Sequence, residues 1–396
     1  EDLERPVSGK IAEFMERSSW IRKMFEEGAR LKQQFGPQNV FDFSLGNPNL
    51  EPSSKLKAAI GAAAGDHAPG VHGYMPNAGL LETRNAIARK IGQDEDFAID
   101  GSNIVMTVGA GGALNVALKT LINPGDEIVI PKPFFVEYVF YCDNHGGSAV
   151  LVPTKPDFSL DISAIEAAIS DKTAAVLINS PNNPTGRIYP ADQINDLAQM
   201  LRAKSKEVGR TIVLISDEPY RGIIYDGASV PSILKSYENS LVVTSFSKDL
   251  SIPGERLGYI AMNPGMQDAE NTLAGLVLCN RILGFVNAPS LIQRAVANHL
   301  TDLVDVSIYK RRRDRLFNAL TGFGYDVIKP EGAFYLFPKS PLEDDVAFVA
   351  RLREKLILTV PGVGFGGPGF FRIAYCVSDE TIEGSLKGFE EAIREL

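Results

Sequence analysis

Residues 175–186 read AVLINSPNNPTG, a short apolar run followed at once by a loop that contains two prolines. Proline lacks a backbone N–H and disfavours helix in the residue before it, so the apolar run is expected to be a strand that ends at Asn179. Runs of the same kind, separated by helical stretches, lie at residues 103–108, 126–130, 211–216 and 241–246. Short apolar strands that alternate with helices are typical of a mostly parallel sheet covered on both faces. We therefore expect an α/β fold.

The segments outside this alternating region predict the domain organisation. Residues 10–35 carry apolar side chains at helical spacing, which predicts one or two amphipathic helices, and residues 291–320 carry a long helical pattern. The C-terminal remainder is expected to be a smaller α+β unit. We expect an N-terminal arm with part of the small domain at 1–48, a large domain at 49–290, and an interdomain helix with the rest of the small domain at 291–396.

Composition excludes several classes of function. The 396 residues carry a formal net charge of −9, which is unsuited to a nucleic-acid partner. Three cysteines without CxxC spacing and four histidines without an HExxH motif predict neither a disulfide framework nor a metal site. No apolar run reaches the roughly eighteen residues of a membrane span, and the charged N-terminal stretch does not resemble a signal peptide. We expect a cytoplasmic protein, with the basic run Lys310–Arg313 on a solvated helix face.

A glycine-rich loop follows the first strand of the alternating region. In MTVGAGGALNVALKTL, residues 106–121, a strand runs into Gly109, Gly111 and Gly112, and an amphipathic helix begins at once. Backbone N–H groups and the helix dipole favour an anion at such a helix start, so the loop is a candidate phosphate site. Two other interpretations remain: a purely structural turn, and part of a dinucleotide-binding GxGxxG motif. The second lacks the acidic residue expected about twenty residues later.

Two further strands end in polar loops that contain proline. The loop after residue 179 displays Asn182 and Asn183 at the carboxyl end of the strand, although an ordinary Asn-Pro turn would give the same pattern. The run TIVLIS delivers Asp217 into the loop DEPYR, with Tyr220 three residues on. Asp217 could serve as a helix N-cap or as the partner of a buried cation.

The strongest apolar strand, at residues 241–246, leads into SFSKDLSIPGERLGY. Ser245, Ser247 and Lys248 stand at its end, and Arg256 follows eight residues after the lysine. A solvated Lys-Asp pair is the competing interpretation. Since ligands of open α/β sheets bind beyond the carboxyl ends of the strands, all of these groups are expected to converge there. A cofactor with a phosphate, a phenolic oxygen, a basic ring nitrogen and an aldehyde would use every one of them. Pyridoxal 5'-phosphate has those four groups.

Taken in order, SPNNPTG, DEPY and SFSK…PGERLGY, with TVGAGGAL upstream and FRIAYC downstream, resemble the motifs of the class I/II aminotransferases of fold type I. The resemblance runs from SLGNP at residue 44 to FRI at residue 371. It implies a large domain that binds pyridoxal 5'-phosphate on a mostly parallel sheet of the seven-stranded type sandwiched by helices. It also implies a smaller α+β domain and a homodimer.

The resemblance assigns roles to individual residues. Lys248 matches the lysine that binds the cofactor covalently and moves the substrate proton, and Asp217 matches the carboxylate that keeps the pyridine nitrogen protonated. Asn183 and Tyr220 match the donors to the ring oxygen O3′, and Phe135 matches the aromatic residue that stacks on the ring. The phosphate cup is matched by Ala110, Gly111, Ser245, Ser247 and Arg256. The remaining matches are Tyr74, which crosses to the partner subunit's cofactor, and Gly46, Asn183 and Arg372, which hold the substrate.

The resemblance also implies the reaction. We expect transfer of an amino group from an L-amino acid to a 2-oxo acid, with aspartate and 2-oxoglutarate as the first hypothesis. Arg281 lies near the position where aspartate-specific relatives carry an arginine for the distal carboxylate. Two alternatives remain: a carbon–sulfur β-lyase that uses the same cofactor residues, and a cofactor-binding regulator without turnover.

Overall fold

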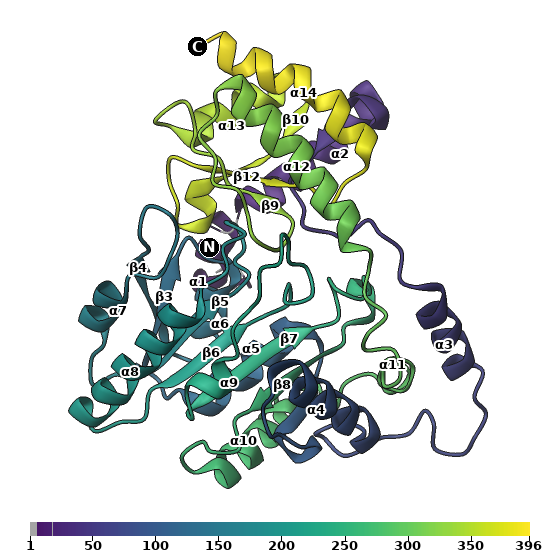
Figure 1. Ribbon diagram of the computed structural model, residues 1–396, viewed down its shortest axis with the longest axis vertical. Coiled ribbons are helices and arrows are strands. Elements are labelled where there is room, and N and C mark those ends of the chain that lie inside the picture. The colour runs from purple at the N-terminus through teal and green to yellow at the C-terminus, as the bar shows by residue number, and fades with distance from the viewer. Residues whose placement is uncertain (1–5, 18) are drawn as a thin grey trace, which may run out of the picture. The chain divides into compact units, whose positions relative to one another are not determined.

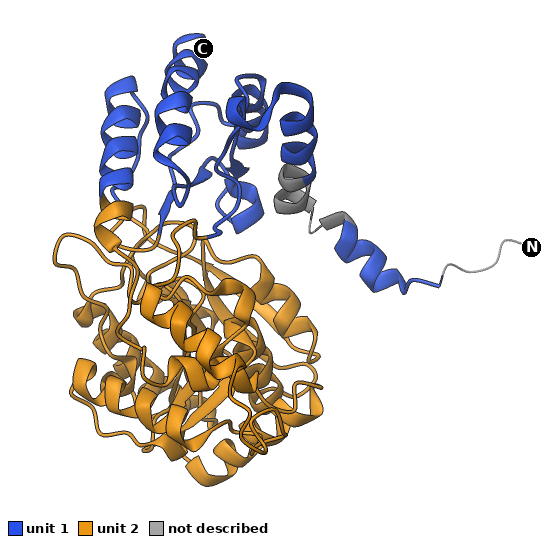
Figure 2. Cartoon of the chain, turned by 90° about the vertical axis from the view of Figure 1, so that its right-hand side faces the viewer, with its two compact units in different colours: residues 1–47, 311–329, 334–396 blue, residues 48–310, 330–333 orange. Residues whose placement is uncertain are grey.

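The computed structural model describes residues 6–17 and 19–396. The chain divides into two compact units, which Figure 2 shows in different colours. Unit 1 consists of residues 1–47, 311–329 and 334–396, and unit 2 of residues 48–310 and 330–333. None of the helices described combines the length and the apolar character needed to cross a bilayer.

A seven-stranded sheet forms the centre of unit 2 (Figure 1). Its strands, in spatial order, are β2 (Ile104–Thr107), β8 (Gly258–Met262), β7 (Ser240–Ser245), β6 (Val213–Asp217), β5 (Thr173–Asn179), β3 (Glu127–Lys132) and β4 (Ser148–Pro153). Only β8 runs antiparallel to its neighbours β2 and β7. The predicted α/β fold with a mostly parallel sheet of seven strands is confirmed.

Helices cover both faces of this sheet. Successive residues of a strand point to opposite faces, so neighbouring residues pack against different helices. Val242 packs on one face and Val243 on the other, in two different clusters of apolar side chains. The helices of unit 2 are α3 (Ser54–Ala64), α4 (Leu81–Glu95), α5 (Gly109–Leu121), α6 (Glu137–Asp143), α7 (Ile162–Ala168), α8 (Ala191–Val208), α9 (Ile233–Ser236), α10 (Ala269–Ile282) and α11 (Ser290–Val296). Burial on both faces explains why the central strands are continuous apolar runs.

Unit 1 is an α+β unit with short strands. The N-terminal helical pattern forms α1 (Gly9–Arg17) and α2 (Ser19–Phe35), as predicted. The other helices are α12 (Val306–Phe323), which begins in unit 2, α13 (Asp345–Glu354) and α14 (Asp379–Arg394). The strands are β1 (Phe41–Asp42), β9 (Tyr335–Leu336), β10 (Ile357–Leu358), β11 (Val360–Pro361) and β12 (Phe371–Ala374). The N-terminal segment joins this unit through the parallel pair β1–β10.

The long helical pattern at residues 291–320 forms two helices, and the second of them, α12 (Val306–Phe323), runs from unit 2 into unit 1. A helix therefore connects the units as expected, but it does not extend over the whole pattern. The chain leaves the helix after Val296, at the end of α11, and resumes it at Val306, at the start of α12. Between them the N–H of Val304 donates to the carbonyl of Asp249 at 2.8 Å. Because this N–H donates to a distant loop, it makes no hydrogen bond within a helix. The spacing of apolar residues does not reveal such a contact.

The basic run at the start of α12 also differs from the expected solvated face. Arg312 and Arg313 are buried, with 7% and 1% of their surface exposed. The Nε of Arg312 lies 2.7 Å from Asp379, and Arg313 pairs with Asp314 at 2.7 Å. Carboxylate partners make the burial of these two charges tolerable.

Candidate active site

The polar residues predicted to form a site in unit 2 follow the carboxyl ends of adjacent strands. Asn179, the last residue of β5, pairs with Asp217, the last residue of β6. Asp217 in turn pairs with Val243 of β7, two residues before Ser245. Strand β8 brings the start of α5 to the same place, because Gly258 lies opposite both Ser245 and the end of β2.

Asp217 is a buried carboxylate with two different oxygens. Its Oδ2 accepts a hydrogen bond of 2.6 Å from the hydroxyl of Tyr138, and its Oδ1 is buried without a hydrogen-bond partner. Burial is the main cause that raises the pKa of Asp217 from 3.8 to about 7, against the lowering effect of Tyr138. An N–H donor that reached Oδ1 would satisfy this oxygen and favour the ionised form.

Tyr138 is a residue that the sequence reasoning missed. It lies in α6, is 1% exposed, and burial raises the pKa of its hydroxyl well above 10, so it remains a donor to Asp217. Its ring meets the ring of Phe135 edge to face, with centroids 5.5 Å apart. Phe135 lies just before α6 begins, so the only available signal was that Tyr138 follows it closely in the sequence.

The glycine loop and Arg256 form a cradle at the N-terminus of α5. Gly109 has φ +68°, and a Cβ placed on it would lie 2.7 Å from Nη2 of Arg256. A Cβ on Gly111 would lie 3.0 Å from the hydroxyl of Tyr141. Ala110, between the two glycines, leaves its backbone N–H as the polar group. The helix start and the guanidinium together suit an anion.

Tyr141 links this cradle to the buried carboxylate. Burial raises the pKa of Tyr141 to about 12, with a further raising effect of the negative charges of Glu137 and Asp217 and a lowering effect of Arg256. The hydroxyl therefore senses both Asp217 and Arg256, the two charged groups predicted to hold opposite ends of a cofactor. The sequence reasoning also missed this residue, which lies in α6, six positions after Phe135.

The remaining predicted residues of unit 2 lie in the loops after β5, β6 and β7. Asn183 and Tyr220 are buried, with 5% and 4% exposed, and the backbone N–H of Asn183 donates to the side chain of Asn179 at 2.6 Å. Ser245 and Ser247 are buried as well, and the N–H of Ser247 donates to Oγ of Ser245 at 3.4 Å. Lys248 follows directly and is half-buried.

Gly46 and Arg372, the predicted substrate-carboxylate residues, come from unit 1. Arg372 lies in β12, is 3% exposed, and donates from Nη2 to the carbonyl of Ser44 at 2.6 Å. Its guanidinium lies 4.7 Å from the ring centroid of Tyr335 and 4.6 Å from that of Phe365. Gly46 packs directly against the hydroxyl of Tyr335, so a side chain there would require the tyrosine to move. Two rings and a carbonyl therefore fix the plane of this guanidinium.

Tyr74 and Arg281 are exposed in this chain. Tyr74 has 91% of its surface exposed and lies in the loop between α3 and α4. Arg281 lies in the last turn of α10. That helix packs against α5, and Phe285 just beyond it reaches within 3.7 Å of a Cβ placed on Gly112.

Comparisons with known proteins agree with this geometry. A family model described as aminotransferase class I and II matches residues 38–388. A probable aspartate/prephenate aminotransferase of Aquifex aeolicus is 32% identical, over 90% of this chain and 92% of its own length.

Solved structures extend the similarity to the whole chain. An amino transferase from Eubacterium rectale is 38% identical with a TM-score of 0.95 and covers 99% of both chains. The aspartate aminotransferase from Thermus thermophilus with maleate is 27% identical with a TM-score of 0.87, over 98% of this chain and 100% of that one.

Proposed function

The chain belongs to the class I and II aminotransferase family, and from that premise we propose that it transfers an amino group from an L-amino acid to a 2-oxo acid with bound pyridoxal 5'-phosphate. Aspartate and 2-oxoglutarate are the proposed substrate pair, supported by relatives named as aspartate aminotransferases. Aminotransferase activity follows from the family. The cofactor and the substrate pair are the proposal.

The buried Oδ1 of Asp217 is the observation that carries the proposal. A buried carboxylate oxygen without a partner is costly, and the protonated ring nitrogen of the cofactor would supply the missing N–H. The cradle of Gly109 and Arg256 would take the phosphate, together with Ala110, Gly111, Ser245 and Ser247. The residues present therefore fit this cofactor at both of its charged ends.

The chemistry that pyridoxal 5'-phosphate supplies when bound is an electron sink for the substrate Cα. Asp217 maintains that property by holding a proton on the ring nitrogen. Lys248 takes the proton from the substrate Cα as a general base. Asn183 and Tyr220 donate to the ring oxygen, and Phe135 stacks on the ring.

The cluster of Arg372 and Gly46 is proposed to bind the α-carboxylate of the substrate, and Asn183 is a further proposed substrate-binding residue. A planar guanidinium gives a two-point contact with a carboxylate, which a lysine does not. Because two aromatic rings hold the guanidinium, its geometry is set before the substrate arrives.

Arg281 is proposed to bind the distal carboxylate of the substrate. Replacement of Arg281 by leucine should then lower aspartate turnover relative to alanine turnover.

We also propose a cytoplasmic homodimer. The three cysteines Cys142, Cys279 and Cys376 are buried and none of them forms a disulfide, which suits a reducing compartment. The exposed Tyr74 is proposed to cross to the partner subunit's cofactor phosphate.

A spectroscopic screen tests the function. Protein loaded with pyridoxal 5'-phosphate is mixed with each of twenty amino acids, and the absorbance of the bound cofactor is followed in stopped flow. Aspartate should convert the cofactor to its amino form and 2-oxoglutarate should return it, whereas Lys248→Ala should bind cofactor without turnover. No reaction with any donor despite bound cofactor would overturn the proposal. Pyruvate and ammonia released from cystathionine without an oxo acid would identify a β-lyase.

Chemical labelling tests the lysine separately. Borohydride reduction of the loaded protein, followed by peptide mapping, should place the pyridoxyl group on Lys248. A label on any other lysine would contradict the assignment.

A further inference from the structure

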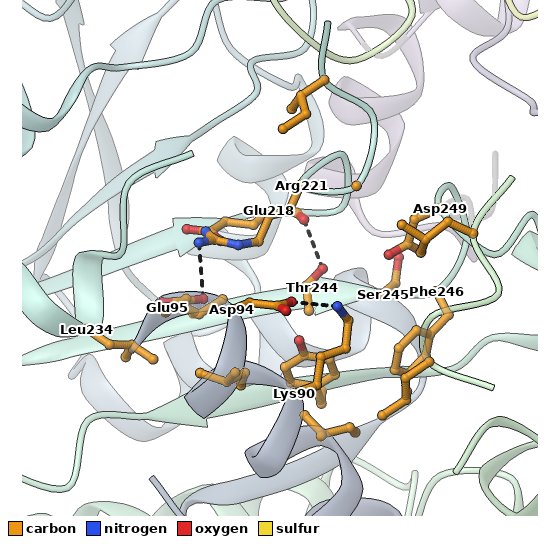
Figure 3. Close-up of a pocket in the computed structure, with 18 residues that line it drawn as sticks. Lys90, Asp94, Glu95, Glu218, Arg221, Leu234, Thr244, Ser245, Phe246 and Asp249 are labelled. Carbon is orange, nitrogen blue, oxygen red and sulfur yellow. Dashed lines mark hydrogen bonds and ion pairs between the residues drawn. The ribbon is translucent and has the colours of Figure 1, made fainter. Parts of the chain in front are cut away.

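Unit 2 contains a cavity of about 350 Å³ against the face of the sheet that α4 covers. Figure 3 shows its lining side chains, most of which come from α4, from β7, and from the loops after β6 and β7, with others from α9, β8 and the segment after α11. Ser245, Phe246 and Asp249 form part of the wall. These residues belong to the segment that carries Lys248, but neither the lysine nor Asp217 lines the cavity.

Carboxylates outnumber cations in this lining. Glu95, Glu218 and Asp249 line the cavity, and Arg221 pairs with the first two at 3.1 and 2.6 Å. The other lining cation, Lys90, is already paired with a carboxylate of its own helix. Figure 3 shows Arg221 and Glu95 facing each other at one end of the set of lining residues. The lining therefore carries an excess of negative charge when its acids are ionised.

Two of these carboxylates have oxygens that the protein leaves without a hydrogen bond. Oε1 of Glu218 and Oε2 of Glu95 are buried and have no partner of normal geometry. The side chains are only 1% and 5% exposed. Burial raises the pKa of Glu218, against the lowering effects of Arg221 and of the Ser216 hydroxyl, which lies near this carboxylate but outside normal hydrogen-bond geometry. Burial also raises the pKa of Asp249 to about 6. A donor with positive charge would offset this desolvation.

The rest of the lining selects the kind of cation. Apolar side chains, including Ile87, Ile91, Leu234 and Leu300, form much of the wall. Within the ranges that the structure describes, no group of three or more His, Cys, Asp or Glu side chains could hold a metal ion. A cavity of this volume is at the small end of organic-ligand sites. An organic cation with a short apolar body fits the apolar wall, the lack of a metal-binding group among the described residues, and the volume of the cavity.

We propose that this cavity binds a small organic cation of the alkylguanidinium class, with its N–H donors on Glu218 and Glu95 and its alkyl chain against the apolar wall. Neither oxygen touches solvent in the present conformation, so binding includes a rotation of the carboxylates toward the ligand. The site is separate from the residues assigned to the cofactor, apart from the shared Ser245, and the inference does not depend on the proposed reaction.

Isothermal titration calorimetry with two isosteric probes tests the site on the full chain. N-butylguanidinium is charged and N-butylurea is neutral, and neither carries a primary amine that could react with pyridoxal 5'-phosphate. The charged probe should bind with a dissociation constant of ~1 mM, and the neutral probe should bind at least about tenfold more weakly. Glu218→Gln and Glu95→Gln should each weaken N-butylguanidinium about tenfold. The matched control is Glu238→Gln, which removes a carboxylate paired with Arg202 outside the cavity and should change nothing.

Three results would overturn the proposal: equal affinity for the two probes, equal weakening by the control variant, or no binding of N-butylguanidinium below about 10 mM. Near-ultraviolet circular dichroism establishes that each variant is folded. If the glutamine variants fail to fold, the two probes on the unmodified chain still decide whether a cation is recognised, and a soaked crystal shows whether it occupies this cavity.

Discussion

Asp217 is a single residue in which burial and hydrogen bonding act in opposite directions. Burial favours the neutral acid, whereas the Tyr138 hydroxyl favours the carboxylate, and the result is a pKa of about 7 in the protein without cofactor. The residue is therefore poised to ionise when a protonated nitrogen arrives at Oδ1. Burial of the carboxylate of Asp217 costs free energy in the protein without cofactor. A protonated nitrogen at Oδ1 removes part of that cost, so Asp217 contributes to cofactor affinity.

The raised pKa predicts a pH dependence of stability. The folded chain binds the proton of Asp217 more tightly than the unfolded chain does, because the pKa rises from 3.8 to about 7 on folding. Its contribution is complete below about pH 4 and is lost as pH rises to about 7, with an upper bound on the order of 4 kcal/mol. Asp217→Asn cannot ionise, so without cofactor its melting temperature should rise relative to wild type between pH 4 and 7. A difference that is constant across this range would contradict the prediction.

Removal of the Tyr138 hydroxyl should act through Asp217. In Tyr138→Phe the carboxylate loses a charge-assisted hydrogen bond, its pKa rises further, and it holds the ring nitrogen less well at neutral pH. We expect cofactor binding about ten- to a hundredfold weaker, measured by fluorescence titration, with the loss smaller at higher pH. Tyr237→Phe is the matched control, because it also loses one buried hydroxyl, which donates to the carbonyl of Ile212 at 2.8 Å. Equal effects of the two variants would show that Tyr138 has only a structural role.

Among the elements, the N-terminus of α5 leaves space for the Arg256 guanidinium because residue 109 is a glycine. In Gly109→Ala the methyl group would enter the space of the Arg256 guanidinium, and φ +68° would add backbone strain. We expect phosphate and cofactor affinity to fall about tenfold or more. Gly209→Ala separates the two causes, because its φ is +69° and its Cβ position has no neighbour within 4 Å. It should cost only about 1 kcal/mol of stability and leave cofactor binding unchanged.

The elements also show what the sequence could predict. Five apolar runs predicted the strands β2, β3, β5, β6 and β7, because strands buried on both faces need apolar residues at every position. The edge strand β4 has mostly part-exposed side chains, and β8 follows a polar loop that was considered only for its Arg256, so neither was predicted. The break between α11 and α12 depends on a contact of Val304 with a distant loop, which no local pattern contains.

In the candidate site, too, the sequence predicted residues at strand ends but not the contacts between segments that are distant in the chain. Residues at strand ends, such as Asp217 and Asn183, were predictable because a parallel sheet brings its carboxyl ends together. Tyr138 and Tyr141 could not be ranked above other tyrosines, because their roles arise from contacts with Asp217 and Gly111, which are distant in the sequence. The cavity beside Glu218 was equally hidden, since it depends on residues as distant in sequence as Ile87 and Leu300.

At the scale of the whole molecule, Tyr74 lies almost wholly in solvent among the residues that the structure describes. A tyrosine with 91% of its surface in solvent, in the loop between two helices of unit 2, neither fills the core nor closes a cavity. Its proposed use is in the dimer, as a donor to the phosphate of the partner subunit's cofactor. A hydrogen bond to a charged group contributes roughly 1.5–3 kcal/mol, so Tyr74→Phe should weaken cofactor binding about ten- to a hundredfold.

Mixed dimers test whether the tyrosine crosses the subunit boundary. Tyr74→Phe and Lys248→Ala chains carry different affinity tags, and the heterodimer is purified with both. If each site takes its lysine from one chain and Tyr74 from the other, one site of the heterodimer has both lesions and the other has neither. The heterodimer should then have one wild-type-like site at limiting cofactor. In the control pair, Tyr141→Phe with Lys248→Ala, the tyrosine serves its own chain and no intact site should form. If the Tyr74 heterodimer shows only the mean activity of its two parents, the tyrosine acts within its own chain or has no part in the site.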